Sequence, residues 1–120
     1  MASVFLMTDV VGSTALWESH EQAMPAVLER HDEIVHRAVA AVGGRVFKHT
    51  GDGMIAVFDE PAPAIAAARD ACAGLATESW AIPGELRIRS SLHSGPATER
   101  NGDFFGPALN RRTNQRRGPP

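Results

Sequence analysis

The segment that most constrains the fold is Thr50-Gly51-Asp52-Gly53, which lies between two short strand-like runs at 45–49 and 54–58. An Asp-Gly pair between strand-like runs is a strong β-hairpin signal, because glycine adopts the backbone angles that a tight turn requires. The sequence therefore predicts two antiparallel strands with Asp52 presented at the turn.

A helix is predicted before this hairpin, from Met24 to Val42, because apolar residues recur there at helical spacing. Pro25 falls in its first turn and Gly43-Gly44 follows its last residues, which are the expected start and stop signals. We expect Ser19 and the glutamine three residues later to form a capping box at its start. His31 lies on the apolar stripe of this helix and is expected in the core.

Further elements complete the order. A buried strand is predicted at 3–7, an alanine-rich helix at 63–76, and a strand at 86–93 whose residues alternate between apolar and polar. The order β-α-β-β-α-β favours an α+β fold, a ferredoxin-like sandwich in which an antiparallel sheet carries its helices on one face. The final residues, 111–120, have no apolar periodicity and are expected to form a disordered basic tail.

The bulk composition narrows the function classes. The length of 120 residues suits one domain. Four of the twelve basic residues lie in the last ten positions, so the first 110 residues are acidic overall, which argues against a nucleic-acid surface.

No segment is long and apolar enough for a leader or a membrane span, so we expect no membrane partner and a cytoplasmic location. The single cysteine, Cys72, is expected to be buried and inert in the alanine-rich helix.

Two aspartates are candidates for a metal site. Asp9 ends the first predicted strand and precedes a glycine-containing loop, and Asp52 lies at the hairpin turn. If these strands are neighbours, the two carboxylates converge, and such a pair repels unless a cation lies between them. Oxygen ligands favour Mg²⁺ or Mn²⁺ over zinc. The alternatives are that Asp9 is a helix cap and that Asp52 serves only the turn geometry.

Three segments together resemble the class III nucleotide cyclases. They are 5–14 (FLMTDVVGST), 47–53 (FKHTGDG) and 102–110 (GDFFGPALN). The resemblance covers residues 3 to 110, about the first two-thirds of that family's catalytic domain. It identifies 1–110 as a partial cyclase catalytic domain that is incomplete at its C-terminus. An arginine-rich ending where an amphipathic helix is expected is typical of a truncated or frameshifted reading frame, and no sensor domain is expected before the first strand.

The resemblance implies a role for each matching residue. Asp9, Asp52 and the carbonyl of Val10 would hold two Mg²⁺ or Mn²⁺ ions per site. The amides of the next four residues would surround the β- and γ-phosphates; these residues are Val11, Gly12, Ser13 and Thr14. Lys48 and Asp103 match the adenine-reading pair of adenylate cyclases, which favours ATP over GTP as substrate.

The same resemblance also marks what is missing. Asn110 matches the asparagine that orients the ribose, but Asn114 stands where the family has a transition-state arginine. The implied activity is conversion of ATP to cyclic AMP and pyrophosphate by a two-metal mechanism, impaired in this chain, in a homodimer whose active sites are shared. The alternative is a non-catalytic nucleotide-binding or regulatory module. A polymerase-like or diguanylate cyclase domain is disfavoured, because its Gly-Gly-Asp/Glu-Glu-Phe type hairpin is absent from the sequence.

Overall fold

A computed structural model of the protein describes residues 3–106 and Leu109. The elements run in the order β1 (Ser3–Val10), α1 (Ser13–Ser19), α2 (Met24–Ala41), β2 (Arg45–His49), β3 (Gly53–Phe58), α3 (Pro61–Thr77), β4 (Ile88–Gly95), β5 (Thr98–Arg100) and β6 (Asp103–Phe105). Strands β1 to β4 form an antiparallel sheet in the order β2-β3-β1-β4, and β5 pairs with β6 in a separate hairpin.

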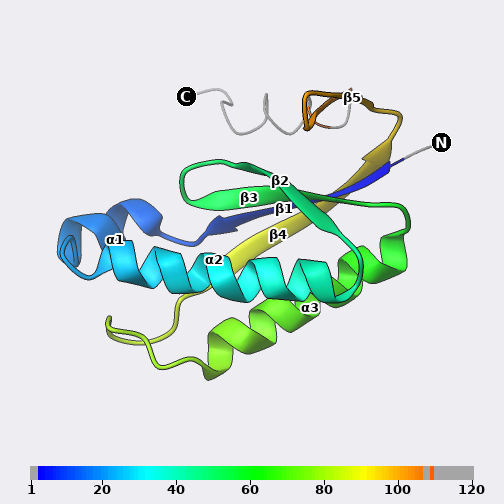
Figure 1. Ribbon diagram of the computed structural model, residues 1–120. Helices are drawn as coiled ribbons and strands as arrows, with labels where there is room; N and C mark the ends of the chain where they lie inside the picture. Colours follow the sequence, from blue (N-terminus) through cyan, green and yellow to red (C-terminus); the bar gives the residue numbers. More distant parts are fainter. Residues whose placement is uncertain (1–2, 107–108, 110–120) are drawn as a thin grey trace.

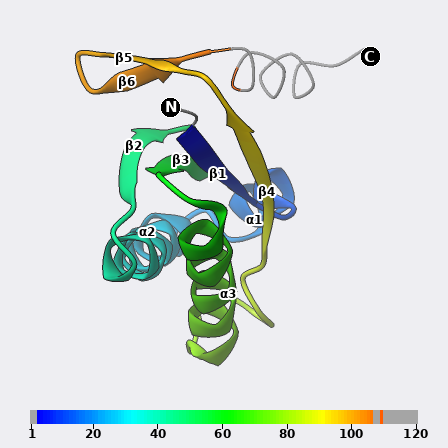
Figure 2. The ribbon, with the colours of Figure 1, turned by 90° about the vertical axis from the view of Figure 1, so that its right-hand side faces the viewer.

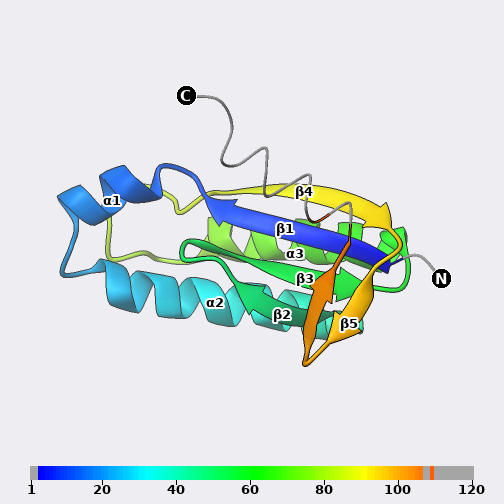
Figure 3. The same ribbon diagram turned by 90° about the horizontal axis from the view of Figure 1, so that it is seen from above.

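The molecule has three layers. Helices α2 and α3 cover one face of the four-stranded sheet, and the β5–β6 hairpin lies over the opposite face (Figures 1 and 2). Helix α1 lies beyond the end of the sheet where β1 finishes, as the view from above shows (Figure 3). The predicted α+β sandwich, an antiparallel sheet with its helices on one face, is confirmed.

Strand β1 is an inner strand, paired with β3 on one side and β4 on the other, and both of its faces are covered. Val4 and Leu6 pack into the core under the helices, whereas Phe5 and Met7 pack on the opposite face with residues of the hairpin layer. A strand buried on both faces reads as a continuous apolar run, which is what the sequence shows at 3–7. The last residues of this strand carry the chain to Asp9, which is itself buried.

Helix α2 buries the stripe predicted from its periodicity, including His31, which is 1% exposed. Pro25 lies in its first turn, and the chain leaves its end through Gly43, which has a positive φ of 82°. The predicted capping box is wrong. Ser19 is the last residue of α1, and α2 begins after Ala23 without a side-chain cap, because α1 takes up the residues that the prediction treated as the approach to α2.

Helix α3 packs through small residues. Ala64, Ala67, Ala71 and Leu75 are its buried positions. The prediction that Cys72 is buried is wrong, since this thiol is exposed. It follows Ala71, which faces the core, and one residue along a helix turns the side chain by about 100°, away from the buried stripe.

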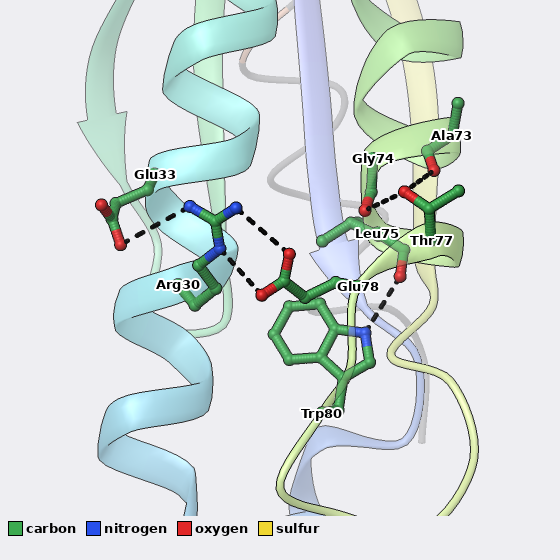
Figure 4. A network of polar contacts seen from close by, with 8 residues as sticks. All are labelled: Arg30, Glu33, Ala73, Gly74, Leu75, Thr77, Glu78 and Trp80. Carbon is green, nitrogen blue, oxygen red and sulfur yellow. Dashed lines mark hydrogen bonds and ion pairs between the residues drawn. The ribbon is translucent and has the colours of Figure 1, made fainter.

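A polar network joins α2 to the end of α3 (Figure 4). The guanidinium of Arg30 donates from Nη2 to Oε1 of Glu78 at 3.1 Å, and its Nε lies 3.0 Å from Oε2 of the same carboxylate. This hydrogen bond to Glu78 raises the pKa of Arg30. Trp80 Nε1 donates to the carbonyl oxygen of Leu75 at 2.9 Å. The contacts fix the chain as it leaves α3.

Several elements differ from the predictions. Strand β4 covers Ile88–Gly95 instead of 86–93, because its ladder with β1 begins at the pair Val10–Ile88 and ends at Ser3–Gly95. The hairpin of β5 and β6 was not predicted as strands, and the short helix α1 was not among the predicted elements. Across the described residues, none of the helices combines the length and the apolar character needed to cross a bilayer.

Candidate functional site

The two candidate metal-binding aspartates come from adjoining positions. In the ladder between β1 and β3, Asp9 is paired with Gly53, and the amide of Val10 donates to the carbonyl oxygen of Asp52 at 3.0 Å. Any side chain at Gly53 would collide with the carbonyl oxygen of Thr8, so glycine permits this close approach. The condition for convergence of the two carboxylates, a hairpin beside the first strand, is therefore met.

Asp9 is held by an arginine from the neighbouring strand. Nε of Arg89 donates to Oδ1 at 3.2 Å and Nη2 donates to Oδ2 at 3.1 Å, which is a two-point contact between guanidinium and carboxylate. The side chain of Asp9 is only 7% exposed and that of Arg89 is 71% exposed. A positive charge therefore lies at the rim of the site, on the solvent side of a buried carboxylate.

Arg89 was missed as a site residue by the sequence analysis. Its partner lies 80 positions away, and only the register of β1 with β4, where Asp9 is paired with Arg89, brings them together. The available signal was the polar face of the strand predicted at 86–93. If the register of this strand with the first strand had been known, Arg89 would have been identified as the polar residue beside Asp9.

Asp52 is connected to the loop that follows β1. The hydroxyl of Ser13 donates to Oδ2 of Asp52 at 2.8 Å. Gly12 has a positive φ of 66°, which lets the chain turn sharply into α1. The amide of Val11 already donates to the carbonyl oxygen of Arg87 at 2.9 Å. Of the four loop residues predicted to surround phosphates, Gly12, Ser13 and Thr14 are the better candidates.

The predicted base-reading pair is joined within one chain. Nζ of Lys48 lies 2.8 Å from Oδ2 of Asp103. The ladder between β2 and β3 is irregular at Phe47, which lies between the pairs Val46–Ala56 and Lys48–Ile55. Phe47 and Ile55 both pack on the hairpin layer, so the bulge presents Lys48 on the sheet face that carries Asp103.

The environment of Asp103 favours its charged form. The hydrogen bond from Lys48 holds the pKa of this carboxyl below its ordinary value, with a further contribution from the amide of Phe104, which donates to Oδ1 at 2.8 Å. Asp103 begins β6, directly after Asn101 and Gly102, whose φ values of 54° and 81° make the tight turn. The hairpin therefore holds the carboxylate over the sheet.

The structure thus brings together Asp9 with Arg89, Asp52 with Ser13, and Lys48 with Asp103, as separate contacts. Asn110 and the predicted tail at 111–120 lie outside the described residues. Among the residues that are described, no group of three or more His, Cys, Asp or Glu side chains is placed to hold a metal ion. Within the described part of the chain, a cation at Asp9 and Asp52 would have these two carboxylates as its charged ligands.

The donor set at Asp9 and Asp52 fits a hard divalent cation. The available atoms are two carboxylates from adjoining backbone positions and nearby backbone carbonyls, which are the oxygen ligands of Mg²⁺ and Mn²⁺. Such ions keep several waters and complete their coordination with substrate phosphates, so a site with two carboxylates is sufficient. The present partners, the guanidinium of Arg89 and the hydroxyl of Ser13, occupy carboxylate oxygens that the cation would use.

The sequence is similar to that of an adenylate cyclase and to that of an uncharacterised protein. The chain is 29% identical over 115 residues to the adenylate cyclase of Neurospora crassa, which covers 96% of this chain and 5% of that protein. It is 32% identical over 108 residues to an uncharacterised protein of Mycobacterium tuberculosis, which covers 88% of this chain and 35% of that protein. The chain therefore spans far less than the full length of either relative. No family model matches it.

Solved structures agree in fold. An adenylate/guanylate cyclase/hydrolase from Silicibacter pomeroyi matches with a TM-score of 0.71 and 27% identity, over 92% of this chain and 65% of that one. The catalytic core of a rhodopsin-guanylyl cyclase with converted specificity, solved with ATPαS, matches with a TM-score of 0.84 and 21% identity, over 93% of this chain and 69% of that one. This chain therefore has the fold of the adenylate/guanylate cyclase catalytic domain, and its sequence is similar to members of that family.

Proposed function

We propose that this chain is a nucleotide cyclase domain that binds ATP with two Mg²⁺ or Mn²⁺ ions and converts it to cyclic AMP and pyrophosphate. The observation that carries the proposal is that Asp9, near the end of β1, lies beside Asp52, in the turn between β2 and β3. Carboxylates that converge on one point provide the oxygen ligands that a divalent cation requires. The cyclase fold supports the same reading.

The residues around this edge have complementary roles in binding the triphosphate. Asp9, Asp52 and the carbonyl of Val10 would hold the cations, and the hydroxyl of Ser13 orients Asp52. The bound cations would supply the positive charge that activates the ribose 3′-hydroxyl and stabilises the departing pyrophosphate. The amides of Gly12, Ser13 and Thr14 would donate to phosphate oxygens, in a turn that the positive φ of Gly12 makes.

Arg89 adds a residue to the proposed phosphate site. Its guanidinium neutralises the carboxylate of Asp9. Because its side chain is 71% exposed, it is free to rotate toward solvent when a cation takes the carboxylate. A guanidinium contacts phosphate oxygens through the same pair of N–H donors, so we assign Arg89 to the β- or γ-phosphate.

Base selection is assigned to Lys48 and Asp103. The ammonium offers donors and the carboxylate offers acceptors, which suits the ring nitrogen and the amino group of adenine; guanine presents the reverse pattern. Their ion pair at 2.8 Å places one donor and one acceptor side by side. ATP is therefore the favoured substrate over GTP.

A second copy of the chain would complete the site. In the family pattern, the metal-holding and base-reading residues of one active site come from different chains, and Asn110 of the base-reading chain orients the ribose. In a two-fold symmetric homodimer each copy supplies both sets to two equivalent sites. The separate Asp9–Arg89 and Lys48–Asp103 contacts within this chain are compatible with that division.

The proposal is tested by incubating the purified chain with Mn²⁺ and ATP and measuring cyclic AMP by chromatography. We expect product above background, and we expect Asp9→Asn and Asp52→Asn to lower it by at least about a hundredfold, the scale on which loss of an electrostatic transition-state contact acts. Asp70→Asn is the control, an exposed carboxylate on α3. Product formation that is insensitive to both site substitutions would contradict the assignment.

The alternative is a nucleotide-binding module without catalysis. Two observations favour it: both oxygens of Asp9 already accept from Arg89, and Asn114 stands where the family carries an arginine. In that case the same assay gives no cyclic AMP, while calorimetry with Mn²⁺ and ATP still records binding that Asp52→Asn abolishes. Absence of both product and binding removes both functions.

A further inference from the structure

We propose a second cation site, selective for transition metals such as Zn²⁺, Ni²⁺ or Cu²⁺, formed by His36 of α2 and His49 of β2. The Nε2 atoms of the two imidazoles lie 3.2 Å apart, and both side chains are exposed to solvent. The rings are stacked, with centroids 5.2 Å apart and an interplanar angle of 22°. Nothing in the proposed cyclase reaction uses either residue.

The distance between the two Nε2 atoms is close to that between two imidazole nitrogens bound to one metal ion. Two imidazole nitrogens bound to one tetrahedral zinc, each at about 2.0–2.1 Å from the metal, lie about 3.3 Å apart. A hydrogen bond between the two Nε2 atoms keeps these ring nitrogens facing each other. Small rotations about the terminal torsions, which are soft in histidine, would aim both lone pairs at a shared ion.

The backbone holds the pair in place from two different elements. His49 is paired with Met54 of β3, and Met54 is buried in the core beneath the helices, so His49 lies on the helix-facing side of the edge strand. Lys48 is presented on the opposite face. His36 follows the buried residue Val35 on α2. The two imidazoles therefore meet across the junction of helix and sheet without any rearrangement of the main chain.

The ligand chemistry separates this site from the proposed nucleotide site. Neutral imidazole is a ligand of zinc, nickel and copper, whereas Mg²⁺ is bound by oxygen. No third histidine, cysteine or acidic side chain among the described residues joins the pair in a metal-binding group. Water would complete the coordination, and the affinity should be that of a two-point chelate and not that of a closed structural zinc site.

The site would link α2 to the strand that leads into the Asp52 turn. His49 is three residues before Asp52, and β2 is the edge strand of the sheet. A metal ion bound to both imidazoles stabilises the folded state, because the unfolded chain does not hold the two side chains together. Zinc should therefore raise the unfolding temperature of the protein, and Mg²⁺ at the same concentration should have no such effect through these residues.

The test is isothermal titration of the full chain with ZnCl₂, without nucleotide, in a buffer that does not bind metals. We expect one equivalent of zinc per chain, and a loss of at least about tenfold in affinity in His36→Gln and in His49→Gln, because the second imidazole binds as an intramolecular ligand. The double variant should bind little more weakly than either single variant. His20→Gln is the control, a histidine at the end of α1.

Three results would overturn the proposal: zinc affinity unchanged in both single variants, losses that simply add in the double variant, or no binding by the wild-type chain. Asp52→Asn keeps its zinc equivalent if the site is at the histidines and loses it if the ion is at the aspartates. On the unmodified protein, zinc should shift the ring proton resonances of His36 and His49 before those of the other three histidines. This readout does not depend on the folding of any variant.

Discussion

At the scale of single residues, the ion pair Lys48–Asp103 favours the charged form of Asp103. The hydrogen bond from Lys48 holds the pKa of Asp103 below the ordinary value. A carboxyl whose pKa is lower in the folded state stabilises that state at pH values above its unfolded pKa, about 3.9, and this contribution is lost as the pH falls through the lower folded value. The contact is therefore intact at neutral pH and opens only in acid.

This charge coupling gives a residue-scale prediction. In Lys48→Met the pKa of Asp103, followed by carbon NMR of its carboxyl group, should rise toward the ordinary value, because its largest stabilising contact is gone. Arg37→Met is the control, because Arg37 is an exposed cation on α2, which lies on the other side of the sheet from the hairpin. A pKa of Asp103 that is the same in the wild type and in Lys48→Met would show that the ion pair does not form in solution.

The local features of the site could be predicted from the sequence better than the contacts between residues that are distant in the sequence. Asp52 at a glycine-containing turn and His31 in the core follow from turn chemistry and helical period, which act over a few residues. Arg89 was missed because its partner is set by sheet register, and Cys72 was misplaced because composition does not say which side of an alanine-rich helix faces inward. Ser19 was misread as a cap because a short helix, α1, ends there.

At the scale of elements, the β5–β6 hairpin depends on aromatic packing. The ring of Phe104 lies 4.7 Å from that of Phe47 and 5.6 Å from that of Phe5, centroid to centroid. The guanidinium of Arg45 lies over the same ring at 5.4 Å. The next residue, Phe105, is 53% exposed. The ring of Phe104 therefore attaches the hairpin to the sheet, together with the ion pairs Lys48–Asp103 and Arg45–Glu99.

This arrangement gives an element-scale prediction. Phe104→Ala should destabilise the protein by about 1–3 kcal/mol, less than the loss of a fully buried ring, because Phe104 is only partly buried. It should also speed amide exchange in β5 and β6 while leaving β1 and β3 protected, as measured by hydrogen exchange with mass spectrometry. Phe105→Ala is the matched control and should change neither. Equal effects of the two substitutions would show that the hairpin is not held by the inner ring.

The order of elements was predictable and their exact limits were not. The β-α-β-β-α-β order, and the placement of the helices on one face of the sheet, follow from the succession of strand-like and helix-like apolar patterns along the chain. Each pattern is a property of its own segment. The start of β4 at Ile88 instead of 86 is set by where β1 ends, which is a property of the pair. The hairpin at 98–105 has a turn signal in Asn101-Gly102 but strands of only three residues, too short to carry a pattern.

At the scale of the whole molecule, the fold separates two sets of proposed site residues. Asp9, Asp52 and Arg89 belong to the sheet end where β1 finishes, and Lys48 and Asp103 belong to the junction of β2 with the β5–β6 hairpin. Each set is already formed within one chain. In the proposed homodimer the first set of one copy would face the second set of the other, so that neither set acts alone.

The central claim is that Asp9 and Asp52 share divalent cations, and paramagnetic broadening by Mn²⁺ tests it most directly. In amide NMR spectra of the protein with ATP, substoichiometric Mn²⁺ should broaden the signals of residues 9–13 and 52–53 first, and Asp52→Asn should abolish this selectivity. Broadening confined to other parts of the chain, or broadening that is the same in the wild type and in Asp52→Asn, would contradict the account.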